Sequence, residues 1–381
     1  MKFLHTSDWH LGRHFHNISL LDDQKAVLEQ ISAYIESNPV DALVIAGDIY
    51  DRTVPPSAAV DVMSDFVEKV CGELNTPIVL IPGNHDGAAR LGFAAQQLKS
   101  SGLHIIHELD QMTNPVLFEK DGQTLAFYGL PYTDPERVRH QFQVPVKDHN
   151  QAYEFLTQEI ASKLKSGHVN VLISHCFVDG ASGSDSERPL AIGGSERVDH
   201  QHFAPFDYVA LGHLHQPQFK GKQTIRYSGS IMKYSFSEQF HNKGMTLVNV
   251  DDDGEVHTEQ ISLTAPHDMR VVEGCMADIL QSGQIDPNSH DYIQVRLMDT
   301  HAILDPMEKL RSVYPNVLHL EKPGMLVNLD QPLAKARLAR GELEMFADFF
   351  LEVQQHPLSD DQQDAMKQLL RQMQKGEEND K

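Results

Sequence analysis

The sequence predicts an α/β layered fold in which short β-strands alternate with amphipathic helices. Short apolar runs of the length of a strand recur through the first two thirds of the 381 residues. Helical stretches separate several of these runs: residues 22–36 place Val27, Ile31 and Ile35 at four-residue spacing, and residues 57–70 repeat that pattern. Strand, helix, strand order is typical of sheets covered by helices.

The predicted strands of this part share a central apolar segment bounded by polar or turn-forming residues. They are Phe3–Thr6, Ala42–Ala46, Ile78–Ile81, His104–His107, Leu125–Leu130, Val169–Ser174, Tyr208–Leu211, Ile225–Ser228 and Met245–Val250. The sequence DDDG at 251–254 predicts a hairpin turn after the last of them.

The chain is longer than one hydrophobic core usually supports, and it is expected to divide into three parts. The first is a large catalytic domain, 1–265. After Pro266 the pattern shortens to a small α+β capping domain, 266–330, with strands and helices in alternation. Its predicted elements are Arg270–Glu273, Met276–Gln281, Tyr292–Leu297, Pro306–Val313 and Val317–Leu320.

The third part, 331–381, is predicted to contain two helices, 341–354 and 360–374. Ser359 and Gln362 have the spacing of a capping box at the start of the second helix. Both helices carry an apolar stripe, and two short helices cannot form a core of their own. The stripes pack either on the preceding domains or on a partner protein, and a partner is the favoured alternative.

The overall composition limits the classes of protein to which the chain can belong. No signal-peptide pattern or long apolar stretch is present, which predicts a soluble, cytoplasmic protein. Three scattered cysteines fit buried thiols better than disulfides. The formal net charge of −22 argues against simple electrostatic binding of nucleic acid, unless bound cations and a partner supply the phosphate contacts.

Five of the predicted strands end in side chains that can bind metal ions. In open α/β sheets, loops at the carboxyl ends of strands converge on one site. One such residue alone would be an ordinary turn former or helix cap, but five strand ends in order indicate a metal centre. The residues are Asp8 and His10, Asp48 and Asp51, Asn84, His85 and Asp86, His175, and finally His213 and His215.

The mixture of carboxylate, amide and imidazole groups suits manganese, iron or zinc better than magnesium or calcium. Gly47, Gly83 and Gly212 each precede a candidate ligand directly. Because glycine lacks Cβ, these positions are expected to allow close approach of the backbone to the site.

The ordered set D-x-H, G-D-x-x-D, G-N-H-D, a single H and G-H-x-H resembles the calcineurin-like metallophosphoesterases. That resemblance implies a four-layer sandwich of two packed sheets flanked by helices. The longer strings TSDWHLG, AGDIYD, IPGNHD, ALGHLH and YSGSIMKYSFSE are similar to one branch, the SbcD nuclease subunits of bacterial SbcC/SbcD complexes. The likeness is strong over residues 1–265.

The resemblance implies roles for individual residues. One divalent cation is held by Asp8, His10 and His215, a second by Asn84, His175 and His213, and Asp48 lies between them. His85 is the catalytic residue. Relatives tend to carry histidine at the position of Asp51.

It further implies a DNA nuclease with two divalent cations, most simply Mn²⁺, acting in DNA repair and recombination. The implied partner is an SbcC-like SMC-family ATPase, with a homodimer of this subunit within a heterotetramer and no membrane. The alternatives are a metallophosphoesterase acting on another phosphodiester or a phosphomonoester, and a scaffold without activity.

Several residues are left with two interpretations. Asp86 either orients His85 or caps a loop, and the Gly/Ser-rich loop 179–200 either contacts substrate or is mobile. Lys233 and Arg226 are phosphate contacts or ordinary surface charges. Trp9 lies between two candidate ligands in an extended segment, so it is expected to face the core.

Overall fold

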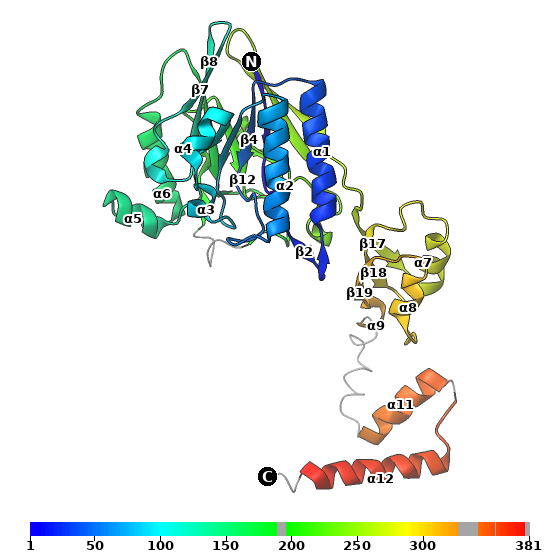
Figure 1. Cartoon of the computed structure of the whole chain (residues 1–381). Helices are drawn as coiled ribbons and strands as arrows, with labels where there is room; N and C mark the ends of the chain where they lie inside the picture. The colour runs from blue at the N-terminus through cyan, green and yellow to red at the C-terminus, as the bar shows by residue number, and fades with distance from the viewer. Residues whose placement is uncertain (189–195, 327–341, 355, 378–381) are drawn as a thin grey trace. The chain divides into compact units, whose positions relative to one another are not determined.

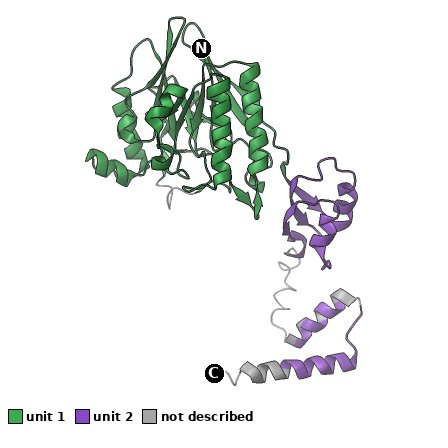
Figure 2. Ribbon diagram, viewed as in Figure 1, with its two compact units in different colours: residues 1–269 green, residues 270–381 purple. Residues whose placement is uncertain are grey.

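A computed structural model of the chain describes residues 1–188, 196–326, 342–354 and 356–377. The chain divides into two compact units, Met1–Met269 and Arg270–Lys381 (Figure 2). No described helix is long and apolar enough to cross a membrane.

The first sheet of the larger unit has the strand order β16-β15-β1-β4-β5-β6. Its parallel strands are β1 (Lys2–Thr6), β4 (Ala42–Ala46), β5 (Ile78–Ile81) and β6 (Leu103–Ile105). The hairpin of β15 (Gly244–Val250) and β16 (Val256–Ser262) joins antiparallel to β1. The helices α1 (Leu21–Ser37) and α2 (Ser57–Val67) connect its parallel strands, as the apolar spacing predicts, and a π-helical segment, Glu68–Glu73, continues α2.

The second sheet has the order β13-β14-β12-β9-β8-β7. Its central strands β8 (Gln123–Leu130), β9 (Val169–His175), β12 (Tyr208–Gly212) and β14 (Lys222–Tyr227) run parallel, and the short edge strands β7 (Val116–Lys120) and β13 (Gln218–Lys220) are antiparallel. The helices α5 (Pro135–Phe142) and α6 (His149–Ala161) belong to this half of the unit.

Apolar side chains from the facing surfaces of the two sheets form one continuous core. Phe3 and Val44 of the first sheet pack with Phe127 and Tyr208 of the second, all fully buried. A separate core lies between the second sheet and α6. Figure 1 shows α1 and α2 on one side of the sheets and α6 on the other, which is the four-layer α/β sandwich expected from the resemblance.

The smaller unit contains β17 (Met269–Gly274), α7 (Met276–Gly283), β18 (Tyr292–Leu297), α8 (Pro306–Arg311) and β19 (Val317–Glu321), followed by a short helix, α9 (Pro323–Leu326). This alternation is the one that the sequence predicts, and the three strands form one sheet around their own core. Two further helices, α11 (Glu342–Gln354) and α12 (Asp360–Glu377), end the described chain. The predicted capping box is present, because Ser359 and Gln362 exchange hydrogen bonds.

The inter-sheet core makes a stability prediction. Phe127→Ala should lower the free energy of unfolding by about 3–5 kcal/mol, because a fully buried ring that packs edge to face on Phe3 is replaced by a cavity. The control Phe240→Ala, at a position 86% exposed, should change it by less than about 0.5 kcal/mol. Urea unfolding followed by fluorescence of Trp9, the only tryptophan, measures both. Equal destabilisation by the two variants would contradict the assignment of this core.

Candidate metal centre

All eight residues of the implied site follow strands whose carboxyl ends meet at one end of the sandwich. The first sheet contributes the residues after β1, β4 and β5, and the second sheet contributes those at the ends of β9 and β12. The structure brings together Asp8, His10, Asp48, Asn84, His85, His175, His213 and His215.

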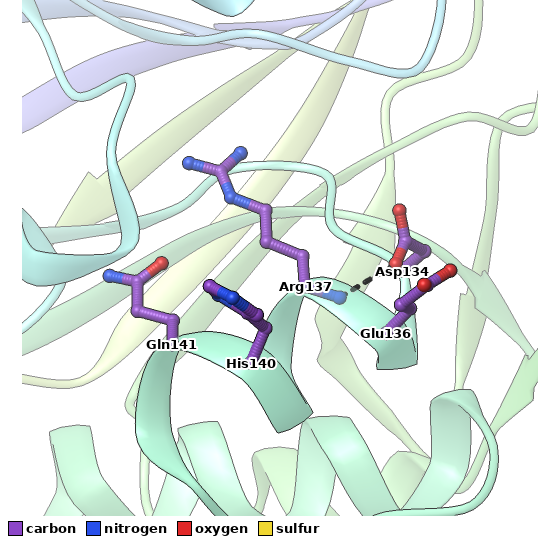
Figure 3. A pocket seen from close by; sticks show the side chains of 5 residues that line it. All are labelled: Asp134, Glu136, Arg137, His140 and Gln141. Atoms are coloured by element: carbon purple, nitrogen blue, oxygen red, sulfur yellow. Dashed lines mark hydrogen bonds between the residues drawn. The ribbon is translucent and has the colours of Figure 1, made fainter.

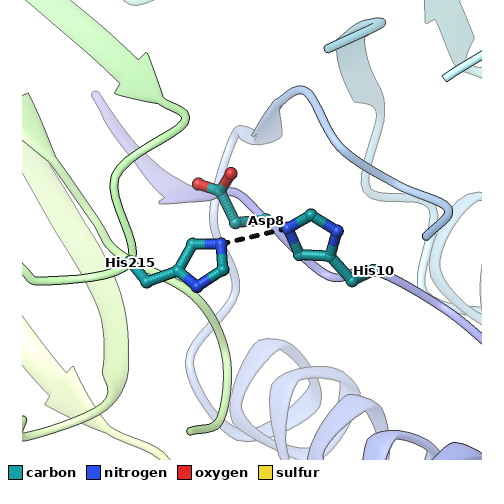
Figure 4. A group of neighbouring side chains, drawn as sticks. All are labelled: Asp8, His10 and His215. Carbon is teal, nitrogen blue, oxygen red and sulfur yellow. Dashed lines mark hydrogen bonds between the residues drawn. The ribbon is translucent and has the colours of Figure 1, made fainter. Parts of the chain in front are cut away.

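Asp8, His10 and His215 form the first group (Figure 4). All three are buried, and the Nε2 atoms of His10 and His215 lie 3.1 Å apart. The backbone N–H of His213 donates to both carboxylate oxygens of Asp8, at 3.0 and 3.1 Å. The Nδ1 atom of His10 is buried with no hydrogen-bond partner among the described residues.

His175 and Asn84 form the second group, beside Asp48. His175 Nδ1 lies 2.9 Å from the carbonyl oxygen of Ala46, so it carries the ring proton and donates it. The Nε2 atom therefore presents a lone pair, yet it lies 2.9 Å from Asn84 Oδ1 and 3.5 Å from Asp48 Oδ2, which are also acceptors. His213 Nδ1 approaches the same Asn84 oxygen at 3.2 Å.

Acceptor atoms that face one another in a buried space need a cation between them. Ligand oxygens from Asp8 and Asp48 and a nitrogen of His175 lie within 4.8 Å of one another, and the first group meets the same limit. The donor set, with the Nε2 atoms of His10 and His215 facing each other at 3.1 Å, therefore fits divalent cations bound by mixed oxygen and nitrogen ligands.

The pKa values of the site residues also indicate a site for cations. Burial and the negative charge of Asp48 raise the pKa of Asp8 well above its ordinary value. Burial and the neighbouring imidazoles hold the pKa of His10 and His213 well below the ordinary value, so these rings are neutral and able to act as ligands. A bound cation would favour the ionised form of Asp8 and stabilise the anionic carboxylates.

The backbone at the site is strained at several candidate ligands. Asp8, His10, Asp48 and His213 have positive φ angles of 55°, 46°, 52° and 102°. Backbone hydrogen bonds hold this geometry: Asp8 N–H donates to Gly47 O at 3.0 Å, and His10 N–H donates to Asp48 O at 2.9 Å. The loops after β1 and β4 are thereby tied together.

All three predicted close-approach glycines are sterically required, and a Cβ on Gly47 would lie 2.5 Å from His175 Nδ1. A Cβ on Gly83 would lie 2.2 Å from Asp48 Oδ1, and a Cβ on Gly212 would lie 1.9 Å from the carbonyl oxygen of Ala46. No side chain fits at any of these positions without moving the site.

His85 lies at the edge of the centre, with 12% of its side chain exposed. Its Nδ1 donates to the backbone carbonyl of Asp51 at 2.8 Å, and its Nε2 lies 4.0 Å from Asp48 Oδ2. The carboxylate of Asp51 lies 3.5 Å from Arg13 and 3.8 Å from His10 Nδ1. The main-chain carbonyl of Asp51 therefore fixes the orientation of the His85 ring.

Asp86 caps a loop. Its carboxylate accepts hydrogen bonds from the backbone N–H groups of Ile49, Tyr50 and Gly83, at 2.9–3.1 Å. Burial and the charge of Asp48 raise the pKa of Asp86 to about 7, against the effect of those three donors. Of its two predicted interpretations, the structure supports the cap.

Two of the remaining residues, Lys233 and Trp9, have structural roles, whereas the buried Nε of Arg226 has no hydrogen-bond partner among the described residues. Lys233 forms an ion pair with Asp268 at 2.8 Å, and Arg226 lies on β14 in register with Ala210. Trp9 is fully buried, as expected. His5, one of the other histidines, bonds Tyr208 in the core, where burial lowers its pKa to about 3.

Sequence reasoning missed a polar group behind His215. Ser186 and Glu187, in the described part of loop 179–200, both bond to His215, and Ser186 also bonds Glu238. Burial alone would raise the pKa of Glu238, but Lys243 and His215 hold it well below its ordinary value. Glu238 ends the string YSGSIMKYSFSE, which is the only signal of this group in the sequence.

A separate pocket is lined by Asp134 and by residues of α5, and none of the candidate ligands lines it (Figure 3). Two of its polar side chains already have partners: Asp134 caps the helix by accepting from Arg137 N–H at 2.8 Å, and the Arg137 side chain pairs with Glu108. The metal centre remains the candidate functional site.

Comparisons with known proteins agree with this geometry. Residues 1–217 match the calcineurin-like phosphoesterase family, and residues 265–354 match a family described as the type 5 capsule protein repressor C-terminal domain. The chain is 34% identical to the SbcD subunit of the nuclease SbcCD from Staphylococcus epidermidis, over 97% of this chain and 98% of that protein.

Two solved structures are similar at lower identity. A protein from Thermus thermophilus is 13% identical with a TM-score of 0.38, and a dimetal phosphatase from Danio rerio is 12% identical with a TM-score of 0.40. Each match covers 68% of this chain, and 98% and 99% of the respective structures. On the family match and the full-length relative, the chain belongs to the calcineurin-like phosphoesterases, and within them to the SbcD family.

Proposed function

We propose that this protein is a two-metal DNA nuclease, the nuclease subunit of a repair and recombination complex with an SMC-family ATPase. The observation that carries this proposal is the buried space in which His175 Nε2, Asn84 Oδ1 and Asp48 Oδ2 face one another as acceptors. A relative whose name is that of a nuclease subunit, similar over nearly the whole of both chains, supports the choice of substrate and partner.

In this proposal Asp8, His10 and His215 hold one cation, and Asn84, His175 and His213 hold the other. Asp48 lies between the two groups, within reach of both His10 and His175. Mn²⁺ suits this mixture of oxygen and imidazole ligands. When bound, the cations supply Lewis-acid stabilisation of the charge that develops on the phosphoryl oxygens.

His85 is proposed to donate a proton to the departing oxygen. Because Nδ1 is held by the Asp51 carbonyl, the transferable proton is the one on Nε2. After transfer the ring is neutral and keeps its Nδ1–H bond, so it does not need to turn. Its partly exposed edge is the side from which a substrate can approach.

A second candidate function follows from the net charge of −22, which opposes binding of a polyanion. It is hydrolysis of another phosphodiester or of a phosphomonoester, which needs few contacts beyond the metal centre. The nuclease proposal requires a partner that contributes phosphate contacts.

The domain roles are part of the proposal: residues 1–265 hydrolyse, residues 266–330 form the capping domain, and residues 331–381 bind the ATPase. The support for the last role is apolar exposure on α11 and α12, where Phe349 is 58%, Leu351 46% and Leu369 50% exposed. Residues 331–341 lie outside the described part of the chain.

The protein should cut duplex DNA with Mn²⁺ and poorly or not at all with Mg²⁺, since magnesium holds its waters and prefers oxygen ligands. Purified protein is incubated with each metal and with duplex DNA, a nucleoside monophosphate or a generic phosphodiester. Activity on the monophosphate alone would favour the second candidate function. Undiminished activity in chelator would falsify the metal mechanism.

Asp48→Ala should abolish cleavage and tight binding of both cations, whereas His85→Gln should lose about 10²- to 10⁴-fold in rate and keep both. Bound manganese counted per chain separates the two defects. Asp41→Ala, directly before the opposite end of strand β4, is the matched control and should keep metal and activity. A metal-free His85→Gln protein would mean that this histidine is misassigned.

Deletion of residues 331–381 should leave Mn²⁺-dependent cleavage of a small phosphodiester intact and eliminate co-purification with the ATPase. The reason is that the deleted helices contain none of the site residues. Cleavage assays and affinity pull-down of the two subunits measure the two effects. If the truncated protein unfolds, or retains full binding to the ATPase, these helices do not form the docking segment.

A further inference from the structure

Behind His215 lies a buried polar group that the proposed reaction does not use. Its members are Ser186, Glu238 and Lys243, with relative exposures of 7%, 0% and 6%. An ion pair between Glu238 and Lys243 at such depth costs desolvation energy, which its members recover only through several further hydrogen bonds. Two of the group's hydrogen bonds, those of Ser186 and Lys243, reach His215.

Two members of the group, Ser186 and Lys243, and the adjacent Glu187 hold His215 at three points. Glu187 Oε1 accepts the backbone N–H of His215 at 2.8 Å, and Lys243 Nζ donates to its carbonyl at 2.7 Å. Ser186 Oγ lies 2.6 Å from the ring Nδ1. Both the main chain and the ring of His215 are therefore fixed from the side away from His10.

The direction of the hydrogen bonds decides which ring nitrogen carries the proton. Glu238 is paired with Lys243 and acts as an acceptor, so Ser186 donates its hydroxyl proton to Glu238 Oε1. Because that proton is committed, the Ser186 oxygen accepts from His215 Nδ1. The proton is then on Nδ1, and Nε2 presents its lone pair toward His10, 3.1 Å away.

The serine lies in a loop that is tied to the opposite side of the centre. Arg13 donates to the carbonyl of Ser186 at 3.0 Å, stacks over Tyr234 at 5.1 Å and approaches Asp51 at 3.5 Å. The loop segment that carries Ser186 is thus part of the metal centre and not only a cover over it.

We propose that Ser186 is a positioning residue, held by the Glu238–Lys243 pair, which sets the tautomer and orientation of His215 for metal binding. Partners of this kind behind a histidine ligand commonly affect metal affinity by about 10- to 100-fold. The inference rests on the proposed role of His215 as a metal ligand.

The test is manganese binding to the full-length protein, measured by titration calorimetry and by metal content after dialysis. Ser186→Ala should weaken one of the two Mn²⁺ sites by about 10- to 100-fold and leave the other unchanged. Ser186→Thr, which keeps the hydroxyl, should restore the affinity. Ser182→Ala, at an exposed serine of the same loop, is the control and should bind like the unmodified protein.

The variant His215→Ala separates this inference from the function on which it rests. If His215→Ala keeps both cations, the ligand assignment itself is wrong. If His215→Ala loses a cation but Ser186→Ala binds both with unchanged affinity, only the positioning role is overturned. Loss of both cations by Ser186→Ala, together with a lower melting temperature in chelator, would also overturn it, because the serine would then be structural.

Discussion

The rest of this structure depends on two negatively charged groups that share one buried space. The carboxylates of Asp8 and Asp48 lie together where the two sheets end, and neither forms an ion pair with a lysine or arginine of the described chain. Backbone N–H groups of His213 and His85 surround them instead, together with the imidazoles of His10, His175 and His213, whose pKa values burial lowers. Bound cations would stabilise both carboxylates in the ionised form, because amide dipoles offset only part of the repulsion and leave the net charge in place.

The same requirement explains the strained backbone. Left-handed φ angles at Asp8, His10 and Asp48 turn the chain sharply just after each strand, so that the side chains point into the shared space. Hydrogen bonds between the loops, tight packing at Gly83 and the capping carboxylate of Asp86 keep these turns from relaxing. The interactions that make the loops rigid are therefore the same ones that hold the cation-binding side chains in place.

Much of the site can be predicted because each ligand is encoded locally, directly after an apolar run that is recognisable as a strand. The central strands and the helices α1 and α2 of the larger unit are predictable from apolar spacing in the same way, whereas α6 is not among the predicted helices. The edge strands β7 and β13 escape prediction, because they are short and none of their residues is buried. The contact of Ser186 with His215 and Glu238 cannot be predicted, since it depends on how three separate loops fold against one another.

The division of the ligands between two sheets also governs when the centre can exist. Residues up to Asn84 supply one half of it, while His175, His213 and His215 come much later in the chain, and β15, which covers the free edge of β1, comes later still. A chain still emerging from the ribosome therefore cannot assemble the complete set. Metal-dependent hydrolysis therefore requires synthesis of the chain at least as far as His215, the last of the candidate ligands in the sequence.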